Sequence, residues 1–254
     1  MKYTDFISDE KIKQIFEEAN QTLNQIKPIE LNNEELAKRI DHTLLKPDAK
    51  LVDINNLCSE AIEFRFYSVC VNPVYVSYCF DILKSTDVKV CSVIGFPLGA
   101  NKTDIKIKEA ENAIQDGAEE LDMVINIGKL KSSEFEYVFE EIKSLAELSK
   151  KFLVKLKVII ETCLLTDQEK IIASSLCKKA GADFVKTSTG FSTGGANIFD
   201  VLLMKLAADG LEIKASGGIK SKLDAFRFIA AGATRLGTSS GVKIIKDELA
   251  NSSY

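Results

Sequence analysis

The segment DFVKTSTGF, residues 183–191, places a lysine at the point where a short strand ends. Phe184 and Val185 are β-strand formers, and the hydroxyl-rich run after Lys186 ends the strand. Three hydroxyl side chains and Gly190 then form a loop that is rich in backbone N–H groups. A lysine in this position is what an amine nucleophile needs when it acts on a phosphorylated substrate.

Strand and helix patterns alternate on both sides of this segment. Short apolar runs predict eight strands, as in a parallel sheet that is buried on both faces. The strands are expected near residues 39–43, 66–71, 88–94, 119–125, 154–160, 184–186, 211–215 and 233–236. Helices are expected from residue 33, at 51–64, from residue 73, and at 101–116, 133–150, 166–181, 196–208, 221–232 and 240–249.

Several of these helices carry recognisable capping residues. Asn101 is expected to cap the helix that follows it. Ser133 with Glu136, and Thr166 with Glu169, have the spacing of a capping box. Each of the two pairs therefore predicts that a helix begins there.

The alternation predicts one α/β domain, a TIM-type (β/α)8 barrel over residues 34–254. A doubly wound sheet is the main alternative, but it needs a glycine fingerprint after its first strand, where DHTLL stands at residues 41–45. Residues 1–33 form a helical extension, in which Ile15, Ala19 and other apolar side chains recur with helical spacing. We expect this extension to pack over the barrel floor or against a partner subunit.

Composition excludes several classes of function. A net charge of −4 predicts no surface for nucleic acid, so a phosphate site must be local. The single histidine, His42, excludes a multi-histidine metal site and disfavours a serine–histidine triad. The six cysteines form no CxxC pair, which favours reduced thiols and a cytoplasmic location. Without a signal peptide or an apolar run of about 18 residues, no segment is expected to span a membrane.

A barrel brings the C-terminal ends of its strands to one mouth, where the chemistry of this fold belongs. The polar residues expected there are Asp41, Cys70, Asp122, Glu161, Lys186 and Lys214. Lys186 and Lys214 end neighbouring strands, and two close amines disfavour each other's protonation. One amine is therefore expected to be free to attack a carbonyl, although two solvated charges are the simpler alternative.

The other charged candidates have alternative structural roles. Asp122 can relay protons beside the two lysines, or it can form a structural ion pair. Lys157 shares a strand face with Glu161, and it is either a third functional lysine or an ion-pair partner of Glu161 or Asp122. Asp41 and Thr43 can bind a substrate hydroxyl or cap a loop.

The remaining candidates are weaker. Cys70 is a nucleophile or a small filler at the mouth, and the filler role is favoured. His42 has no evident partner and is expected to be structural. Phe191 either walls the pocket or simply packs. Glycine-rich loops at residues 216–218 and 237–240 follow the last two strands, where barrels often bind phosphate.

Six strand-end motifs carry a family resemblance. They are DHTLL (41–45), VCVNP (69–73), ELDMV (120–124), VIIET (158–162), VKTSTGF (185–191) and KASGGI (214–219). With these motifs in the same order, residues 34–250 resemble the deoxyribose-phosphate aldolases, which are class I Schiff-base aldolases. The resemblance implies cleavage of 2-deoxy-D-ribose 5-phosphate to D-glyceraldehyde 3-phosphate and acetaldehyde, in deoxyribonucleotide catabolism and without a metal or cofactor.

Carried over one position at a time, the resemblance implies that Lys186 forms the Schiff base. It also implies that Lys214 lowers the pKa of Lys186, and that Lys214 and Asp122 relay protons. The expected substrate contacts, of which the glycines and serines line the phosphate pocket, are Asp41, Thr43, Cys70, Thr189, Gly190, Gly217, Gly218, Gly237, Ser239 and Ser240. Some members have a lysine where Phe191 stands here, so the backbone must hold more of the phosphate. Tyr254 resembles a terminal tyrosine thought to shuttle a proton, and a disordered terminus is the alternative.

Two other interpretations remain open. One is a Schiff-base lyase of the same barrel family that acts on another phosphorylated sugar. The other is a sensor that binds a phosphosugar and has kept the pocket without the chemistry. Because members of the family are commonly dimers, we also expect a homodimer.

Overall fold

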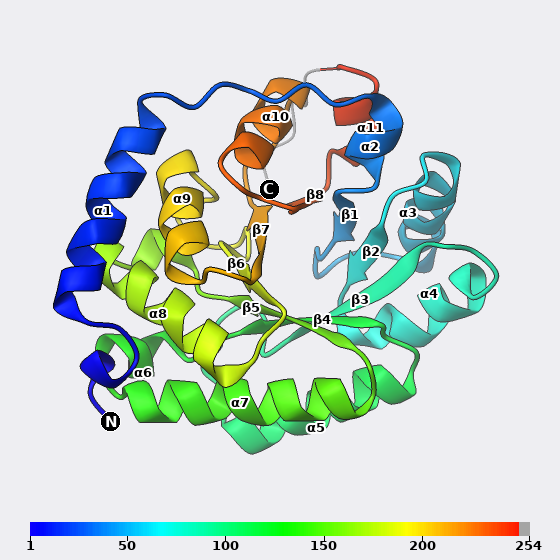
Figure 1. Ribbon diagram of the computed structural model, residues 1–254. Helices are drawn as coiled ribbons and strands as arrows, with labels where there is room; N and C mark the ends of the chain where they lie inside the picture. The colour runs from blue at the N-terminus through cyan, green and yellow to red at the C-terminus, as the bar shows by residue number, and fades with distance from the viewer. Residues whose placement is uncertain (249–254) are drawn as a thin grey trace.

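The computed structural model describes residues 1–248 and shows a closed ring of parallel strands surrounded by helices (Figure 1). The strands are β1 (Ile40–Leu44), β2 (Ser68–Val71), β3 (Lys89–Ile94), β4 (Glu120–Val124), β5 (Lys155–Ile159), β6 (Phe184–Lys186), β7 (Glu212–Ser216) and β8 (Arg235–Thr238). They pair in chain order, and β1 closes the ring against β8 with Asp41 opposite Gly237. The predicted (β/α)8 barrel is confirmed.

The helices form an outer layer around the ring (Figure 1). They are α1 (Asp9–Leu23), α2 (Asn33–Ala37), α3 (Leu51–Glu63), α4 (Val76–Leu83), α5 (Thr103–Gln115), α6 (Ile127–Lys131), α7 (Phe135–Lys151), α8 (Asp167–Ala180), α9 (Ile198–Ala207), α10 (Lys222–Ala230) and α11 (Gly241–Ile245). Single 3₁₀ turns lie at Tyr3–Asp5, Pro73–Tyr75 and Thr162–Leu164.

The strands divide the core into an apolar shell and a charged centre. On β4, Leu121 and Met123 are fully buried in the shell between strands and helices. Because side chains alternate along a strand, Glu120 and Asp122 point the other way, into the barrel. Most barrels fill that space with branched apolar side chains, whereas this one holds buried acids and bases.

The N-terminal extension packs on the outside of the barrel. Helix α1 lies along α9, where Phe16 meets Phe199 edge-on at 5.6 Å and Ile15 and Ala19 are buried (Figure 1). Of the two expected positions of this helix, the barrel floor is wrong, because its apolar face packs on the outer wall. Packing against a partner subunit stays a prediction. The segment near residues 31–35 lines a cavity at the N-terminal ends of the strands.

Two capping predictions fail, and one is confirmed. Thr166 and Glu169 form the predicted capping box at the start of α8. Ser133 instead has a left-handed backbone with φ of 60°, because it sits in the turn between α6 and α7. Asn101 is also wrong as a cap, since Lys102 precedes α5 and makes no side-chain capping bond.

The last helix is shorter than expected. It ends at Ile245 rather than near residue 249, because Asp247 adopts a left-handed φ of 59° that a helix does not continue through. Within residues 1–248, no helix has the length and apolar character that crossing a bilayer requires. All six cysteines are free thiols.

Candidate active site

Asp122 lies at the centre of three lysines inside the barrel. Lys186 and Lys214 donate to its Oδ2 at 2.6 and 2.7 Å, and Lys157 donates to its Oδ1 at 2.9 Å. Strand pairing brings them together, because Lys157 is opposite Asp122 across β4 and β5 while Lys186 is opposite Lys214 across β6 and β7. All four side chains are buried. Asp122, Lys186 and Lys214 thus lie together as predicted, while their catalytic roles stay predictions. Lys157 forms an ion pair with Asp122, which is one of the two roles expected for it.

The cluster fixes the charge of three of its members. Burial alone raises the pKa of a carboxyl, yet the lysines hold the pKa of Asp122 well below its usual range. Burial lowers the pKa of Lys214, but the carboxylates of Asp122 and Asp41 outweigh burial and raise that pKa overall. The pKa of Lys157 is also raised against burial, mainly by Asp122. Asp122 is therefore ionised, and Lys157 and Lys214 are protonated, near neutral pH.

This result corrects one expectation about the lysine pair. Lys186 and Lys214 do not face each other as two bare cations, because both donate to the same oxygen of Asp122. Mutual repulsion therefore does not deprotonate Lys214, whose proton is held between two carboxylates. A free amine must come from the balance of charge in the whole cluster.

Asp41 points into the barrel and contacts two cations. Its Oδ1 accepts from Nη1 of Arg235 at 2.7 Å, and its Oδ2 contacts Nζ of Lys214. The hydroxyl of Thr43 donates to the backbone oxygen of Asp41 at 2.8 Å. Both side chains are therefore already bonded within the protein. A contact of either one with a substrate hydroxyl stays a prediction.

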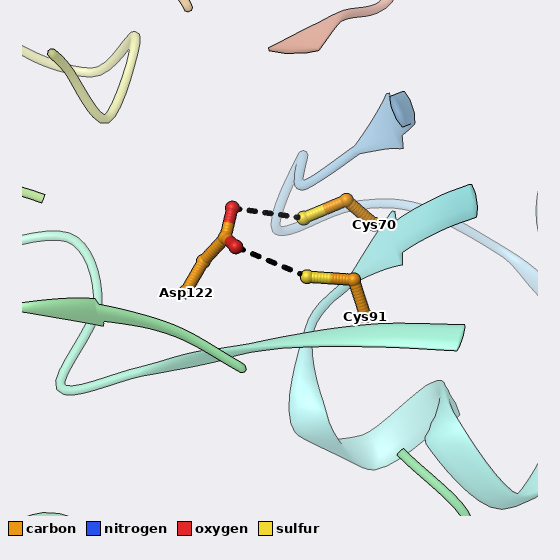
Figure 2. A group of neighbouring side chains, drawn as sticks. All are labelled: Cys70, Cys91 and Asp122. Atoms are coloured by element: carbon orange, nitrogen blue, oxygen red, sulfur yellow. Dashed lines mark hydrogen bonds between the residues drawn. The ribbon is translucent and has the colours of Figure 1, made fainter. Parts of the chain in front are cut away.

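Two thiols also contact Asp122. Figure 2 shows Cys70 and Cys91, from adjacent strands, aimed at its two oxygens, with the sulfurs at 3.8 and 3.2 Å. A thiophilic metal would need this carboxylate as a ligand, but its oxygens already accept hydrogen bonds from three lysine side chains. The lysine side chains therefore occupy the positions around this carboxylate that a metal would need. Cys70 is a small buried side chain at this place.

Glu161 organises the loop after β6. Its carboxylate accepts from the backbone N–H of Thr189 and from the hydroxyl of the same residue. Glu161 itself has a left-handed backbone with φ of 53°, an uncommon conformation for a residue other than glycine. Burial raises its pKa above the usual value in spite of these bonds. It therefore acts on the loop of Thr189 and Gly190 and has no direct bond to Asp122 in the structure.

The glycine-rich loops come together beside this loop. Gly190, Gly217 and Gly218 have positive φ values of 85°, 84° and 79°, so other residues would be strained there. A Cβ at Gly217 would lie 2.9 Å from the Cα of Gly195. The loops after β7 and β8 form a small depression. It is lined by Gly217, Gly218, Ile219, Lys220, Gly237, Thr238, Ser239 and Ser240.

Phe191 lies at the edge of the same region. Its ring meets Phe96, which follows β3, edge-on at 5.3 Å. Phe191 is 41% exposed, so it both packs and borders solvent. Tyr254, the proposed proton shuttle, lies outside the described residues.

The sequence analysis missed the lower part of the charged centre. Glu120 and Arg235 are the first residues of β4 and β8, at the end of the barrel away from the mouth, and both are buried. The available signal was the i, i+2 spacing of Glu120 and Asp122, which puts both acids on one strand face. His42 also has a partner that was not foreseen, because its Nε2 lies 2.6 Å from Oε2 of Glu60 on α3.

Comparison with known proteins places these features in a class. Residues 36–247 match the family model described as DeoC/LacD family aldolase. A deoxyribose-phosphate aldolase from Streptococcus pneumoniae serotype 19F (strain G54) is 57% identical over 220 residues, which is 86% of this chain and 99% of the relative.

Two solved structures agree with this match. The tetrameric deoxyribose phosphate aldolase from Aeropyrum pernix has a TM-score of 0.80 and 37% identity, over 92% of this chain and 96% of its own. The aldolase QR15 has a TM-score of 0.79 and 44% identity, over 83% of this chain and 94% of its own. The chain is thus a (β/α)8-barrel aldolase. More particularly, it belongs to the DeoC/LacD family of aldolases.

Proposed function

We propose that this protein is a class I aldolase that cleaves 2-deoxy-D-ribose 5-phosphate into D-glyceraldehyde 3-phosphate and acetaldehyde, in the breakdown of deoxyribonucleotides. One observation carries the proposal, namely that Lys186 and Lys214 donate to one oxygen of the buried Asp122. The 57% identity to a protein named deoxyribose-phosphate aldolase supports the choice of substrate.

The charge of the cluster supports Lys186 as the nucleophile. Among residues 1–248, the connected charged groups at the barrel centre comprise the acids Asp41, Glu120 and Asp122 and the bases Lys157, Lys186, Lys214 and Arg235. Four bases against three acids leave one positive charge in excess, which a buried site disfavours. Lys157, Lys214 and Arg235 are each held by at least two carboxylates, whereas Lys186 contacts Asp122 alone. Lys186 is therefore the base with the fewest carboxylate partners in this cluster, and we assign it the role of the nucleophile.

The reaction then begins at the free amine. Neutral Lys186 attacks the C1 aldehyde of the open-chain sugar, and Lys214 donates a proton as the carbinolamine loses water. The product is an iminium ion, which accepts an electron pair. Asp122, acting through Lys214 or a water, removes the proton of the C3 hydroxyl, and the C2–C3 bond breaks. Its electron pair moves toward the iminium nitrogen and leaves an enamine.

The second half of the reaction restores the enzyme. D-Glyceraldehyde 3-phosphate departs with its new C3 carbonyl, and the enamine takes up a proton at C2. Water then hydrolyses the iminium, so that acetaldehyde leaves and the amine of Lys186 is free again. In this scheme the protein supplies position, a tuned amine and a proton path.

The phosphate is assigned to the glycine-rich loops. Gly217, Gly218 and Gly237 allow the backbone to approach an anion closely, and Ser239 and Ser240 add hydroxyl donors. Phe191 brings no charge, so recognition relies on backbone N–H groups and on nearby polar side chains.

Cleavage by purified protein tests the proposal. We expect acetaldehyde and glyceraldehyde 3-phosphate to form from 2-deoxyribose 5-phosphate at an undiminished rate in the presence of a strong chelator. A panel of other phosphorylated sugars should be cleaved more slowly by their kcat/KM. Binding without any turnover would instead indicate a phosphosugar sensor, and a faster panel sugar would indicate another Schiff-base lyase.

The assembly also remains to be measured. We propose a homodimer, while the relative from Aeropyrum pernix is described as tetrameric. Size-exclusion chromatography with light scattering distinguishes the two states, and a tetramer would contradict our proposal.

A further inference from the structure

Six charged side chains form a closed ring beneath the proposed nucleophile. Acids and bases alternate around it, and each member contacts the next. We call it the charge ring, and its members in order are Arg235, Glu120, Lys157, Asp122, Lys214 and Asp41.

The ring joins Arg235 to Asp122 by two arms. In the first arm, Nη1 of Arg235 lies 3.1 Å from Oε2 of Glu120, whose Oε2 is 2.8 Å from Nζ of Lys157. Lys157 then reaches Oδ1 of Asp122 at 2.9 Å. In the second arm, Arg235 donates to Asp41 at 2.7 Å, and Asp41 contacts Lys214, which reaches the other oxygen of Asp122 at 2.7 Å.

The ring is neutral when all its members are ionised, because it holds three carboxylates and three cations. Lys186 is bound to it through Asp122 but is not one of its members. A change of one charge at Arg235 or Glu120 therefore alters the electrostatic potential at Lys186 without removing a direct contact of that amine. The ring is deeply buried, with Arg235 the most exposed member at 5%, so solvent screens such a change poorly.

Arg235 and Glu120 are at the far end of the ring from the mouth. Both border a cavity at the N-terminal ends of the strands, on the opposite side from the glycine-rich loops. The guanidinium of Arg235 is fixed there, with its Cζ 3.4 Å from the centre of the Tyr67 ring and 5.4 Å from that of Phe184. Neither residue is placed to touch a substrate bound at the mouth.

We propose that Arg235 and Glu120 are positioning residues, which act through the charge ring to hold Asp122 in place and to set the proton affinity of Lys186. The inference rests on the proposed Schiff-base function. It assigns a role to the lower end of the barrel, where a purely structural ion pair would be the ordinary interpretation.

The proposal makes predictions of opposite sign for the two residues. Glu120→Gln removes a negative charge, leaves the ring with one excess positive charge and disfavours the protonated form of Lys186. Arg235→Met removes a positive charge and favours the protonated form. The other groups that face Lys186 are unchanged in both variants, namely Asp122 on β4, Lys214 on β7, Cys70 on β2 and Glu161 after β5.

The experiment follows two pH profiles from about pH 5 to pH 9. One is kcat/KM for cleavage of 2-deoxyribose 5-phosphate, and the other is the rate of borohydride trapping at Lys186, measured by mass spectrometry. We expect the acid limb of both profiles to move to lower pH in Glu120→Gln and to higher pH in Arg235→Met, by about one pH unit each. The Glu120→Gln/Arg235→Met double variant restores neutrality, so its limb should return toward that of the wild type.

One control, Arg235→Lys, separates the effect of charge from an effect on folding. Arg235→Lys keeps the charge and should keep the limb within a few tenths of a pH unit, although the weaker fit of lysine is expected to lower the melting temperature. Should Arg235→Met fail to fold, Glu120→Gln still decides the matter, because glutamine keeps the size and hydrogen-bonding ability of glutamate.

The outcomes also separate this inference from the proposed function. If the wild type cleaves the sugar and is trapped at Lys186, but the variants leave the limb in place or move it in one direction only, the ring has no such role. If the wild type is neither active nor trapped, the proposed function itself is wrong.

Discussion

At the scale of single residues, Asp122 is the group on which the site depends. It accepts hydrogen bonds from three lysines through two oxygens, and burial makes each bond strong because water does not compete. From sequence, the motif ELDMV and the two strand-end lysines located this meeting point. Arg235 and Glu120 were not predicted, because a charged residue at the start of a strand usually lies on the surface.

Asp122→Asn tests this dependence. The amide keeps the shape of the side chain but neither balances the lysine charges nor takes a proton. We expect kcat/KM to fall by about 10²- to 10⁴-fold, the usual contribution of acid–base groups. Asp167→Asn, which alters an exposed partner of Lys170, is the matched control and should retain activity. A mild effect of Asp122→Asn with the circular dichroism spectrum unchanged would contradict the assignment.

The same carboxylates make stability depend on pH. Neighbouring cations lower the pKa of Asp41 and of Asp122 in the folded protein, although burial opposes them. Since both pKa values are depressed, their stabilisation is present above the unfolded value of about 3.9 and is lost as the pH falls below it. Urea unfolding from pH 7 to pH 3 should show the free energy of unfolding decreasing toward acid, with a smaller decrease in Asp41→Asn. Equal pH dependence in both proteins would argue against this origin.

At the scale of elements, local sequence signals succeed where tertiary context agrees with them. Thr166 and Ser133 both stand three residues before a glutamate, yet only Thr166 begins a helix. The short helix α6, capped by Asn126, occupies the chain just before Ser133 and forces a left-handed turn there. No signal in residues 126–133 distinguished that outcome, because five-residue helices are held by packing rather than by propensity.

Thr166→Ala measures the confirmed capping box. The hydroxyl of Thr166 accepts from the backbone N–H of Glu169, and the Glu169 carboxylate accepts from the N–H of Thr166. We expect the substitution to lower the free energy of unfolding by about 1 kcal/mol, as chemical denaturation would report. Thr166→Ser keeps the acceptor and should lose much less, whereas equal losses in the two variants would show that the cap is not responsible.

A buried ion pair ties α5 to α7 behind β4. Lys106 donates to Glu141 at 2.7 Å and to the backbone oxygen of Val124 at 2.8 Å, with both side chains fully buried. Lys106→Met would leave Glu141 uncompensated and should cost about 3–5 kcal/mol of stability. The Lys106→Met/Glu141→Leu double variant should recover part of that loss in the same denaturation experiment. Absence of recovery would mean that packing, not charge, sets the cost.

At the scale of the whole molecule, the barrel was readable from sequence because its strands and helices alternate without interruption. The position of α1 could not be predicted in this way, because an amphipathic pattern shows that one helix face is buried but not which surface it packs against. The relative from Streptococcus pneumoniae aligns over 99% of its length with only 86% of this chain, so part of this chain has no counterpart in that relative. We propose that the N-terminal extension stabilises the outer wall and takes no part in the chemistry.

Deletion of residues 1–23 tests whether the extension contributes to stability but not to catalysis. The truncated protein loses the contacts of Ile15 and Ala19 with the outer wall, so its melting temperature should fall. We expect kcat/KM at 25 °C to stay within about threefold of the full chain, because the charged centre of the barrel is untouched. Full-length Ile15→Ala should show a smaller fall in melting temperature. Loss of activity in a truncated protein that remains folded would give the extension a functional role.

Reductive trapping of Lys186 tests the central claim most directly. The protein is incubated with 2-deoxyribose 5-phosphate and sodium borohydride, digested, and mapped by mass spectrometry beside Lys186→Met. We expect a reduced adduct on the peptide that contains Lys186, none in the variant, and loss of cleavage activity in that variant. An adduct on Lys157 or Lys214 instead, or full activity in Lys186→Met, would contradict the proposed mechanism.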